Sequence, residues 1–598
     1  MRCADYLFRA LADRGVKDVF LVTGGGAMFL NDALRCEKRL APVCCHHEQG
    51  AAIAAEGYAR ITGRTAVVSV TTGPGGTNAL TGIIGEWLDS QPVLCVSGQV
   101  KKATSLLAQP GNRLRQLGDQ EIDIVDIVRP VTKYAAVVDD PRKIAVELEK
   151  ALYLAESGRP GPVWLDIPID VQSAEVDPDA LEHFAPPAAG RLAPDEDDLR
   201  RAVESFLRAQ SPVIIAGQGI RLAGAEAAFE RLAGKLGVPL LATFEGFDMI
   251  PTGDPLMIGR IGTIGTRAGN IALQNADWVL SLGSRNNIRQ ISYNFENFAR
   301  RAAEFVAVDI DRAELDKPTV RPTLKIHADA GEFIARFDAL LGTPPRRPAH
   351  ERWLAWCQER KSRYPAVAEH RRPVAEGIDP YVFTEILTEY LPENAIVGCA
   401  NATPSLALFQ SGIVKSGQRM ICNSGCAAMG FGLPVTLGCA VAAAGSERCV
   451  VCLDGDGSLM MNLQELQTIA AYRLPVKLFL YDNGEYASIR QTHDNFFGAR
   501  IGCDAGSGVT FPEWRLVAGA FAWKYLRIDS EAAARRLVPE ILAEKAPVFC
   551  DVALAPGYTF APKLSSRRLP DGRLVSPSLE DMFPVLPEAE MRDNIYGK

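Results

Sequence analysis

The chain has 598 residues and carries 64 Lys and Arg against 72 Asp and Glu, which gives a formal net charge of −8 at pH 7. This acidic balance argues against a nucleic-acid-binding surface. Hydrophobic residues make up 47% and charged residues 23% of the chain, which is ordinary for a globular enzyme. The length predicts about three or four domains.

No segment is apolar and long enough to span a bilayer, so we expect no membrane partner. Asp5, Arg9 and Asp13 lie among the apolar positions at the N-terminus, which predicts an amphipathic helix over 3–14 and not a signal peptide. Fourteen cysteines are scattered through apolar segments. We interpret them as free, buried thiols, and we therefore expect a reducing, cytoplasmic location.

Helices and short apolar strands alternate along the chain in three blocks, at 1–177, 195–341 and 376–554. A Pro/Ala-rich linker is predicted at 178–194, a Pro/Arg-rich linker at 342–350, and an extended C-terminal tail at 555–598. The alternation predicts an α/β fold with doubly wound parallel sheets. The elements expected are helices at 3–14, 48–61 and 463–472, and strands at 18–21, 65–70, 92–97, 163–167, 212–216, 278–282, 305–308, 395–397, 448–453 and 476–481.

The acidic, glycine-rich turn that follows strand 448–453 is the most informative feature. It contains Gly455, Asp456, Gly457 and Ser458, and Asn483 follows the next strand. Asp456 and Asn483 therefore lie at the carboxyl ends of two strands of one βαβ unit, where open α/β sheets bind ligands. Two oxygen ligands, a glycine turn and a helix N-terminus suit a diphosphate bound through Mg²⁺.

This motif, with 25 residues between Gly457 and Asn483, resembles that of thiamine diphosphate (ThDP) enzymes, and the chain is similar to acetolactate synthase large-subunit-like carboligases. An acidic turn in an unrelated α/β domain is the alternative. The resemblance implies pyrimidine-binding, central and diphosphate-binding domains, in that order. It also implies that Asp456, Asn483 and the backbone carbonyl of Glu485 bind the metal, and that Tyr486 lies near the cofactor.

The segment 45–52 resembles the family's His-Glu-Gln-Gly-Ala sequence, and this resemblance makes Glu48 the residue that activates the cofactor. A carboxyl group that hydrogen-bonds N1′ of the pyrimidine favours the imino tautomer, which removes the thiazolium C2 proton. A glutamate placed at a helix N-terminus by the macrodipole is the alternative reading. For His46 and His47, orientation of Glu48 and packing are favoured over proton transfer.

Four further residues of the first block are expected near the cofactor or substrate. Gly73 and Asn78 belong to a turn that resembles the family's Gly-Pro-Gly turn, and Asn78 is predicted to cap or begin the following helix. Gln120 is the candidate for hydrogen-bonding the 2-oxo acid or the pyrimidine region. Gly25 is also expected to contact the cofactor.

In the third block, segment 423–434 resembles the family's Met-Gly-Phe-Gly-Leu-Pro segment. By this resemblance Met429 holds the cofactor bent and the carbonyl of Ala427 accepts from its 4′-nitrogen, although a core methionine is the usual alternative. Asn401 and Ala402 are expected to hold the diphosphate. In the family the two halves of the site meet across a subunit interface, which implies a homodimer or homotetramer with interface active sites.

Acetolactate synthases bind FAD in the central block. The positions that resemble their flavin site are Gly217, Gly262, Gly283, Arg285 and Asp309. Flavin-bound relatives carry Asp-Asp-Arg where this chain has residues 287–289, so an empty or nucleotide-binding central domain stays an alternative.

The resemblance implies transfer of a two-carbon acetyl unit from pyruvate or a similar 2-oxo acid to a carbonyl acceptor. Thr492 occupies a position where branched-chain acetolactate synthases carry Trp. Segments 486–492 and 562–572 are similar to ThDP carboligases of bacterial sugar pathways, which suggests a keto-sugar acceptor. Arg490 and His493 could meet this acceptor, and surface salt bridges are the alternative for both. The alternatives are a non-carboligating 2-oxo acid decarboxylase, another ThDP-dependent lyase or oxidase, and a catalytically inactive regulatory subunit that retains the fold.

Overall fold

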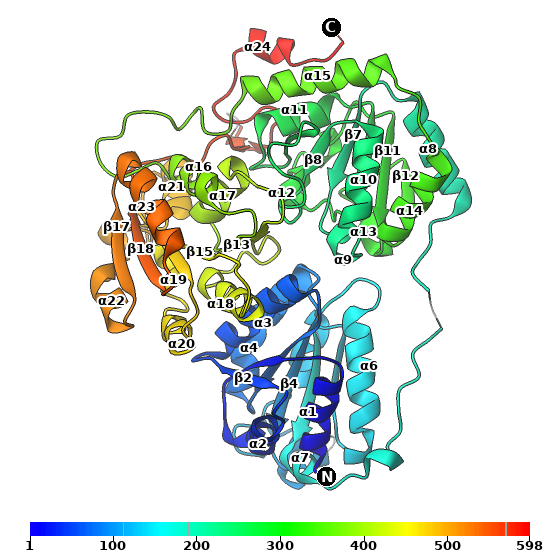
Figure 1. The fold of residues 1–598 in the computed structure, drawn as a ribbon, viewed down its shortest axis with the longest axis vertical. Helices are drawn as coiled ribbons and strands as arrows, with labels where there is room; N and C mark the ends of the chain where they lie inside the picture. The colour runs from blue at the N-terminus through cyan, green and yellow to red at the C-terminus, as the bar shows by residue number, and fades with distance from the viewer. Residues whose placement is uncertain (110, 112, 189, 569–570, 598) are drawn as a thin grey trace.

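The computed structural model describes residues 1–109, 111, 113–188, 190–568 and 571–597. Each of the three blocks forms one six-stranded sheet in which every pair of neighbouring strands is parallel (Figure 1). The α/β fold class with three doubly wound parallel sheets is therefore confirmed. Two residues of the tail segment at 562–572, Leu569 and Pro570, lie outside the described residues.

The first domain has strand order β2-β1-β3-β4-β6-β5. Its strands are β1 (Asp18–Leu21), β2 (Ala41–Cys44), β3 (Ala66–Val70), β4 (Val93–Gln99), β5 (Tyr134–Val137) and β6 (Val163–Pro168). Its helices are α1 (Cys3–Asp13), α2 (Met28–Cys36), α3 (Glu48–Thr62), α4 (Pro74–Leu88), α5 (Ile124–Val128), α6 (Ile144–Glu156) and α7 (Ile169–Ser173).

The central domain has strand order β12-β11-β10-β7-β8-β9. Its strands are β7 (Pro212–Ala216), β8 (Leu240–Ala242), β9 (Met257–Arg260), β10 (Trp278–Leu282), β11 (Glu304–Asp309) and β12 (Leu324–His327). Its helices are α8 (Glu196–Arg208), α9 (Gly219–Leu222), α10 (Glu226–Leu236), α11 (Arg267–Asn275), α12 (Ile288–Ile291), α13 (Arg312–Asp316), α14 (Ala330–Leu341) and α15 (Pro348–Arg363).

The third domain has strand order β14-β13-β15-β16-β18-β17. Its strands are β13 (Ile396–Cys399), β14 (Arg419–Ile421), β15 (Val450–Gly455), β16 (Lys477–Asp482), β17 (Lys524–Ile528) and β18 (Val548–Ala553). Its helices are α16 (Pro380–Tyr390), α17 (Thr403–Ser411), α18 (Gly432–Ala442), α19 (Asp456–Leu459), α20 (Glu465–Ala471), α21 (Ala487–Phe496), α22 (Trp514–Ala520) and α23 (Glu531–Ala543).

The connecting segments differ in part from expectation. The stretch at 178–194 crosses from the first to the central domain, and its described residues form only a short 3₁₀ turn, at Pro178–Ala180. The stretch at 342–350 is cut short because α15 begins at Pro348, and Pro is favoured in the first turn of a helix. The tail adds the short antiparallel pair β19 (Arg567–Arg568) and β20 (Leu574–Val575) and helix α24 (Glu588–Asp593).

Burial explains why the strands could be recognised. Strands β3, β4, β7 and β10 are buried at every position because helices cover both faces of a parallel sheet, so their sequences are continuous apolar runs. All fourteen cysteines are free, as expected, but the expectation that they are buried is wrong for Cys36 and Cys44, which are exposed. Among the described residues, no helix has the length and apolar character needed to cross a membrane.

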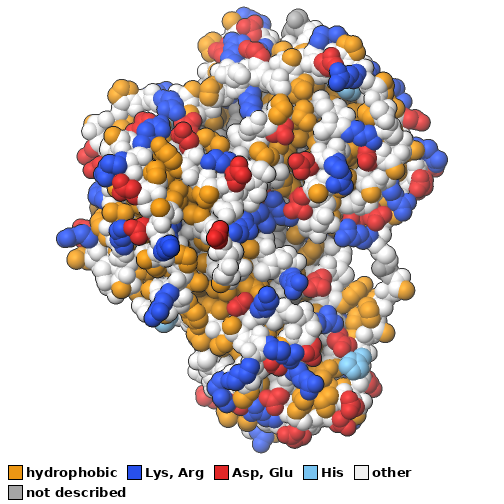
Figure 2. Space-filling view, viewed as in Figure 1, with side chains coloured by type: hydrophobic (Ala, Val, Ile, Leu, Met, Phe, Trp, Pro, Cys, Tyr) orange, Lys and Arg blue, Asp and Glu red, His pale blue; other side chains and the backbone are white. Residues whose placement is uncertain are grey.

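The first and third domains meet through helices α3 and α18, which approach closely because glycines face the partner helix. A Cβ atom on Gly438 would lie 1.7 Å from the carbonyl oxygen of Ala54, and one on Gly57 would lie 2.2 Å from that of Val435. Figure 2 shows apolar side chains gathered where these two domains meet. The backbone contact leaves no space for any side chain, so it fixes the distance between the domains.

We expect Gly438→Ala to lower stability by about 1–3 kcal/mol, because the helices must separate to admit a methyl group. Thermal or urea unfolding measures the loss. Gly234→Ala is the matched control, since Gly234 lies inside α10 and nothing is within 4 Å of its Cβ position. Alanine there should be neutral or stabilising by up to about 1 kcal/mol. Equal effects of the two variants would contradict this packing argument.

Candidate active site

The carboxylate of Asp456 joins the ends of two neighbouring strands. Asp456 follows β15 directly and is 3% exposed. Its Oδ1 accepts a hydrogen bond from the backbone N–H of Gly457 at 2.6 Å, and its Oδ2 accepts from Asn483 at 3.1 Å and Gly484 at 2.7 Å. Burial raises the pKa of Asp456 to about 7, although these N–H donors oppose the rise. A nearby cation would favour the ionised form.

Asn483 is held by a residue that sequence reasoning missed. Its Nδ2 donates to the hydroxyl of Tyr558 at 2.7 Å, and that hydroxyl is 2.7 Å from Thr403 Oγ1. Tyr558 is buried, and burial raises its pKa. Its hydroxyl bridges the helix start after β13 and the loop after β16. No motif marks Tyr558, which lies in the irregular segment after β18.

A small, hard cation such as Mg²⁺ prefers oxygen ligands. The Asp456 carboxylate, the Asn483 side-chain oxygen and the Glu485 backbone carbonyl are donors of this kind. The Glu485 side chain is engaged elsewhere, because its Oε1 accepts from Arg490 Nε at 2.7 Å. Within the described ranges, no group of three His, Cys, Asp or Glu side chains is arranged to hold a metal ion. A site here therefore depends on amide and backbone oxygens as well as one carboxylate.

The glycine turn lies beneath an aromatic ring. A Cβ atom on Gly457 would lie 2.1 Å from Cε1 of Tyr486, whereas nothing is within 4 Å of the Cβ position of Gly455. Ser458 Oγ accepts from the backbone N–H of Gly430 at 2.9 Å. The turn is thus covered by Tyr486 on one side and tied to the segment before α18 on the other.

Two alanines beside this turn have a backbone conformation that favours glycine. Ala402 has φ of +54° and Ala427 has φ of +53°. Asn401 Nδ2 donates to the carbonyl of Ala427 at 3.0 Å, and the N–H of Ala427 donates to Asn423 Oδ1 at 2.6 Å. A carbonyl has two lone pairs, so that of Ala427 keeps acceptor capacity. Met429, two residues on, is half-buried.

Glu48 lies at the corresponding edge of the first sheet, as the first residue of α3. It is 8% exposed, and its Oε2 accepts from Asn78 Nδ2 at 3.0 Å. The expectation that Asn78 caps or begins a helix is wrong, because α4 already begins at Pro74. Within the described part of the chain, no hydrogen bond joins Glu48 to Asp456, Asn483 or Glu485.

The two histidines beside Glu48 shape the turn. His47 is the N-cap of α3, and its Nδ1 accepts from the N–H of Gln49 at 3.1 Å. The N–H groups of His46 and His47 donate to Glu465 Oε1 of α20 at 3.1 and 3.2 Å. These backbone bonds join the start of α3 to the third domain, and orientation of Glu48 by the histidine rings stays a prediction.

Gln120 and Gly73 lie together at the same sheet edge. A Cβ atom on Gly73 would lie 2.2 Å from the carbonyl oxygen of Gln120, which itself has φ of +58°. A Cβ atom on Gly75 would be 3.7 Å from Glu48 Oε1, so this turn passes beside the glutamate. Gly25 is in a 3₁₀ turn after β1, with open space at its Cβ position.

A cavity lies between the central domain and its two neighbours. Gly283, Arg285 and Asp309 line it, together with Asp89 and Arg159 of the first domain. Gly217 packs behind it, with its Cβ position 2.2 Å from the carbonyl oxygen of Gly283. Gly262 lies against the backbone of 289–290. Burial raises the pKa of Asp309 to about 6.

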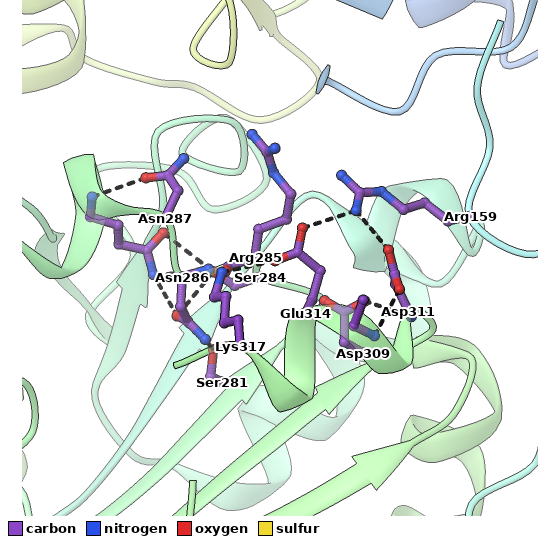
Figure 3. Close-up of polar contacts among 12 residues, drawn as sticks. Arg159, Ser281, Ser284, Arg285, Asn286, Asn287, Asp309, Asp311, Glu314 and Lys317 are labelled. Atoms are coloured by element: carbon purple, nitrogen blue, oxygen red, sulfur yellow. Dashed lines mark hydrogen bonds and ion pairs between the residues drawn. The ribbon is translucent and has the colours of Figure 1, made fainter. Parts of the chain in front are cut away.

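A network of charged groups adjoins this cavity through two of its lining residues, Arg159 and Arg285 (Figure 3). Arg159 Nη1 is 2.9 Å from both Asp311 Oδ2 and Glu314 Oε1. Lys317 binds Glu314 and the carbonyl of Arg285. The Arg285 guanidinium extends away from the central sheet toward the first domain, where it is 3.9 Å from Asp89. The cavity therefore presents cations and carboxylates together.

Three family models match the chain in succession. Residues 1–127 match the thiamine pyrophosphate enzyme N-terminal TPP binding domain, residues 199–337 the central domain, and residues 401–552 the C-terminal TPP binding domain. The chain belongs to the thiamine pyrophosphate enzyme family. The resemblance inferred from Asp456, Asn483 and their surroundings is confirmed.

Curated relatives include several acetolactate synthases. Acetolactate synthase 2, chloroplastic, of Nicotiana tabacum is 32% identical over 563 residues, which cover 92% of this chain and 81% of that protein. Acetolactate synthase isozyme 1 large subunit of Escherichia coli (strain K12) is 31% identical, with coverages of 92% and 93%. The acetolactate synthase large subunit of Lactococcus lactis is also 31% identical, with 92% of each chain covered.

We expect Tyr558→Phe to weaken binding of ThDP with Mg²⁺ by about 10-fold, because Asn483 loses the partner that orients it. Fluorescence titration measures the dissociation constant. Tyr364→Phe is the control, since the Tyr364 hydroxyl also accepts from an asparagine side chain, Asn594 Nδ2 at 2.8 Å, at the end of α15. Wild-type affinity in Tyr558→Phe would contradict the assigned role.

Proposed function

We propose that this family member is a ThDP- and Mg²⁺-dependent carboligase. It transfers a two-carbon acetyl unit from pyruvate or a similar 2-oxo acid to a carbonyl acceptor. The similarity to acetolactate synthases over 92% of the chain supports the reaction class. The observation that carries the proposal is the buried Asp456 carboxylate, which is held by N–H groups from the ends of two strands.

The third domain holds the charged end of the cofactor in this proposal. Asp456, Asn483 and the carbonyl of Glu485 would bind Mg²⁺. The N–H groups of Gly457 and Ser458 would contact the diphosphate, as would Asn401 and Ala402, and Gly455 and Tyr486 complete its surroundings. Because Asp456 is nearly inaccessible to water, its attraction for a cation is weakly screened.

Glu48 acts at the pyrimidine end. Its carboxyl would hydrogen-bond N1′ of the pyrimidine, and the hydrogen bond from Asn78 fixes the carboxyl in place. Gly25 and Gly73 allow close backbone approach, while Gln120 orients the 2-oxo acid. Ala427 and Met429 set the shape of the cofactor. When bound, ThDP supplies the electron sink that decarboxylation of a 2-oxo acid requires.

We propose a homodimer or homotetramer, since Glu48 and Asp456 lie in different domains with no hydrogen bond between them in the described part of the chain. Exposed apolar side chains after the helices that follow Asp456 and Asn483 support this assembly. Met460 and Met461, just after α19, are 43% and 50% exposed, and Phe497 and Ile501, after α21, are 73% and 77% exposed. A second copy would cover such a surface.

FAD is the proposed occupant of the central cavity, with Gly283, Arg285 and Asp309 in contact and Gly217 and Gly262 shaping the turns around it. A basic side chain beside a buried carboxylate suits a diphosphate linked to a ribose. A nucleotide without flavin is the alternative, because this chain has Asn287 at a position where flavin-bound relatives have Asp. The fourteen free cysteines support a cytoplasmic location.

We propose more specifically that the carbonyl acceptor is a keto sugar. Thr492 on α21 is small, and its Oγ1 donates to the carbonyl of Ser488 at 2.9 Å, so it fills little space. His493 remains a candidate to meet the acceptor. The salt-bridge alternative is favoured for Arg490, because it binds Glu485, Asp494 and the carbonyl of Tyr558.

Product analysis with pyruvate tests the reaction. We expect decarboxylation with carbon–carbon bond formation, detected by mass spectrometry. Acetolactate from pyruvate alone selects a synthase, and product only with a nucleotide-linked keto sugar selects the sugar carboligase. Acetaldehyde alone would select the simple decarboxylase. An absence of ThDP binding would favour the inactive regulatory subunit.

We expect Glu48→Gln to lower kcat by at least about 100-fold while the dissociation constant for ThDP changes by less than about 3-fold, because proton sharing with the pyrimidine is lost. Steady-state kinetics and titration separate the two effects. Glu156→Gln is the control, since Glu156 accepts from Thr65 Oγ1 at 2.6 Å in the same domain. Retained activity in Glu48→Gln would refute the role of Glu48.

A further inference from the structure

Arg60 lies where the three domains meet. Its side chain is 3% exposed and makes ion pairs with Glu56 at 2.7 Å, Asp89 at 3.1 Å and Glu245 at 2.8 Å. Glu56 and Arg60 belong to α3, Asp89 is the C-cap of α4, and Glu245 follows β8 of the central domain. One guanidinium therefore binds carboxylates from two domains.

Two of these carboxylates also reach the third domain. Asp89 accepts from Arg60 with Oδ2 and from the N–H of Gly425 with Oδ1, at 3.0 Å. Glu245 accepts from Arg60 with Oε2 and from the N–H of Ser424 with Oε1, at 2.8 Å. A Cβ atom on Gly425 would be 2.5 Å from Asp89 Oδ1, so the contact is close. Each carboxylate thus bridges Arg60 and one of two consecutive backbone amides.

The backbone held in this way leads directly to the strained alanine. Asn423, beside Ser424, accepts from the N–H of Ala427 at 2.6 Å. A non-glycine residue at φ of +53° persists only where its surroundings fix it. The two carboxylates supply part of that constraint, because they fix the segment immediately before Ala427 and Met429.

The balance of charges around Arg60 explains why the contacts to Ser424 and Gly425 depend on the negative charges of Asp89 and Glu245. The Arg60 guanidinium faces three carboxylates, those of Glu56, Asp89 and Glu245. The Arg285 guanidinium lies farther away, at 3.9 Å from Asp89. Buried carboxylates in excess over cations need other donors, and the N–H groups of Ser424 and Gly425 provide them. A neutral side chain at position 89 or 245 would hold these amides less strongly.

We propose that Asp89 and Glu245 are positioning residues for the cofactor site, which act through Ser424 and Gly425 on the segment carrying Ala427 and Met429. The inference rests on the proposed function for the assignment of Ala427 and Met429 to ThDP. It adds that the first and central domains set the shape of the cofactor segment of the third domain.

The test compares Asp89→Asn and Glu245→Gln with a matched control, Asp248→Asn. Asp248 also has a buried side chain that joins the central and third domains, with Arg221 at 2.7 Å, Arg419 at 3.1 Å and the N–H of Met420 at 3.0 Å. It holds β14, upstream of the cofactor segment. All three variants are isosteric and each removes one buried negative charge.

Hydrogen exchange of the full-length protein without cofactor is the first measurement. We expect peptides covering 423–429 to exchange at least about 10-fold faster in Asp89→Asn and in Glu245→Gln, because local opening becomes easier. The control should leave these peptides at the wild-type rate, although its melting temperature falls. Unchanged exchange in both variants, or equal acceleration in Asp248→Asn, would overturn the proposal.

Cofactor affinity is the second measurement. We expect the dissociation constant for ThDP with Mg²⁺ to rise at least about 10-fold in the two variants, with kcat recovering at saturating ThDP. Wild-type affinity in both would overturn the proposal. If the wild-type protein bound no ThDP, the proposed function would fail and the exchange rates alone would decide the inference. If one variant does not fold, the other still decides it.

Discussion

The buried carboxylate of Asp456 is the constraint on which the candidate site depends. A carboxylate that is 3% exposed needs hydrogen-bond donors, and here they come from the backbone at the ends of β15 and β16. The two strands are adjacent and in register, with Gly455 opposite Tyr481. The loops that follow must therefore close on each other. Tyr486 lies over Gly457 as a result, and Asn483 is brought within reach of Tyr558.

Much of the fold could be predicted because parallel strands are buried on both faces. The runs at 212–216 and 278–282 coincide with β7 and β10, whereas β15 begins and ends two residues later than expected. Short or less apolar elements such as β8, β9 and α15 have no comparable pattern and were missed. The error at Asn78 has a local cause, since Pro74 starts α4 one turn earlier.

The candidate site also contains some residues that could be predicted from the sequence and others that could not. Asp456 and Asn483 could be placed together from strand ends alone, because ligand-binding loops of parallel sheets lie at one edge. The roles of Glu48 and Met429 came only from the resemblance. Tyr558 could not be found, since a buried hydroxyl that bridges two loops leaves no periodicity or spacing in the sequence. The same holds for Asp89 and Glu245, whose partners are backbone amides more than 170 residues away.

Ala402 and Ala427, both at positive φ, show which backbone conformation the segments around the site require. Glycine at either position would adopt the same backbone conformation without strain, and so would make local folding easier. It would also widen the range of conformations open to the segment. A thermostabilised form of this protein, chosen only for resistance to heat, would be expected to accept glycine at these two positions and to lose turnover as it did so. Engineering for stability should therefore leave both alanines unchanged.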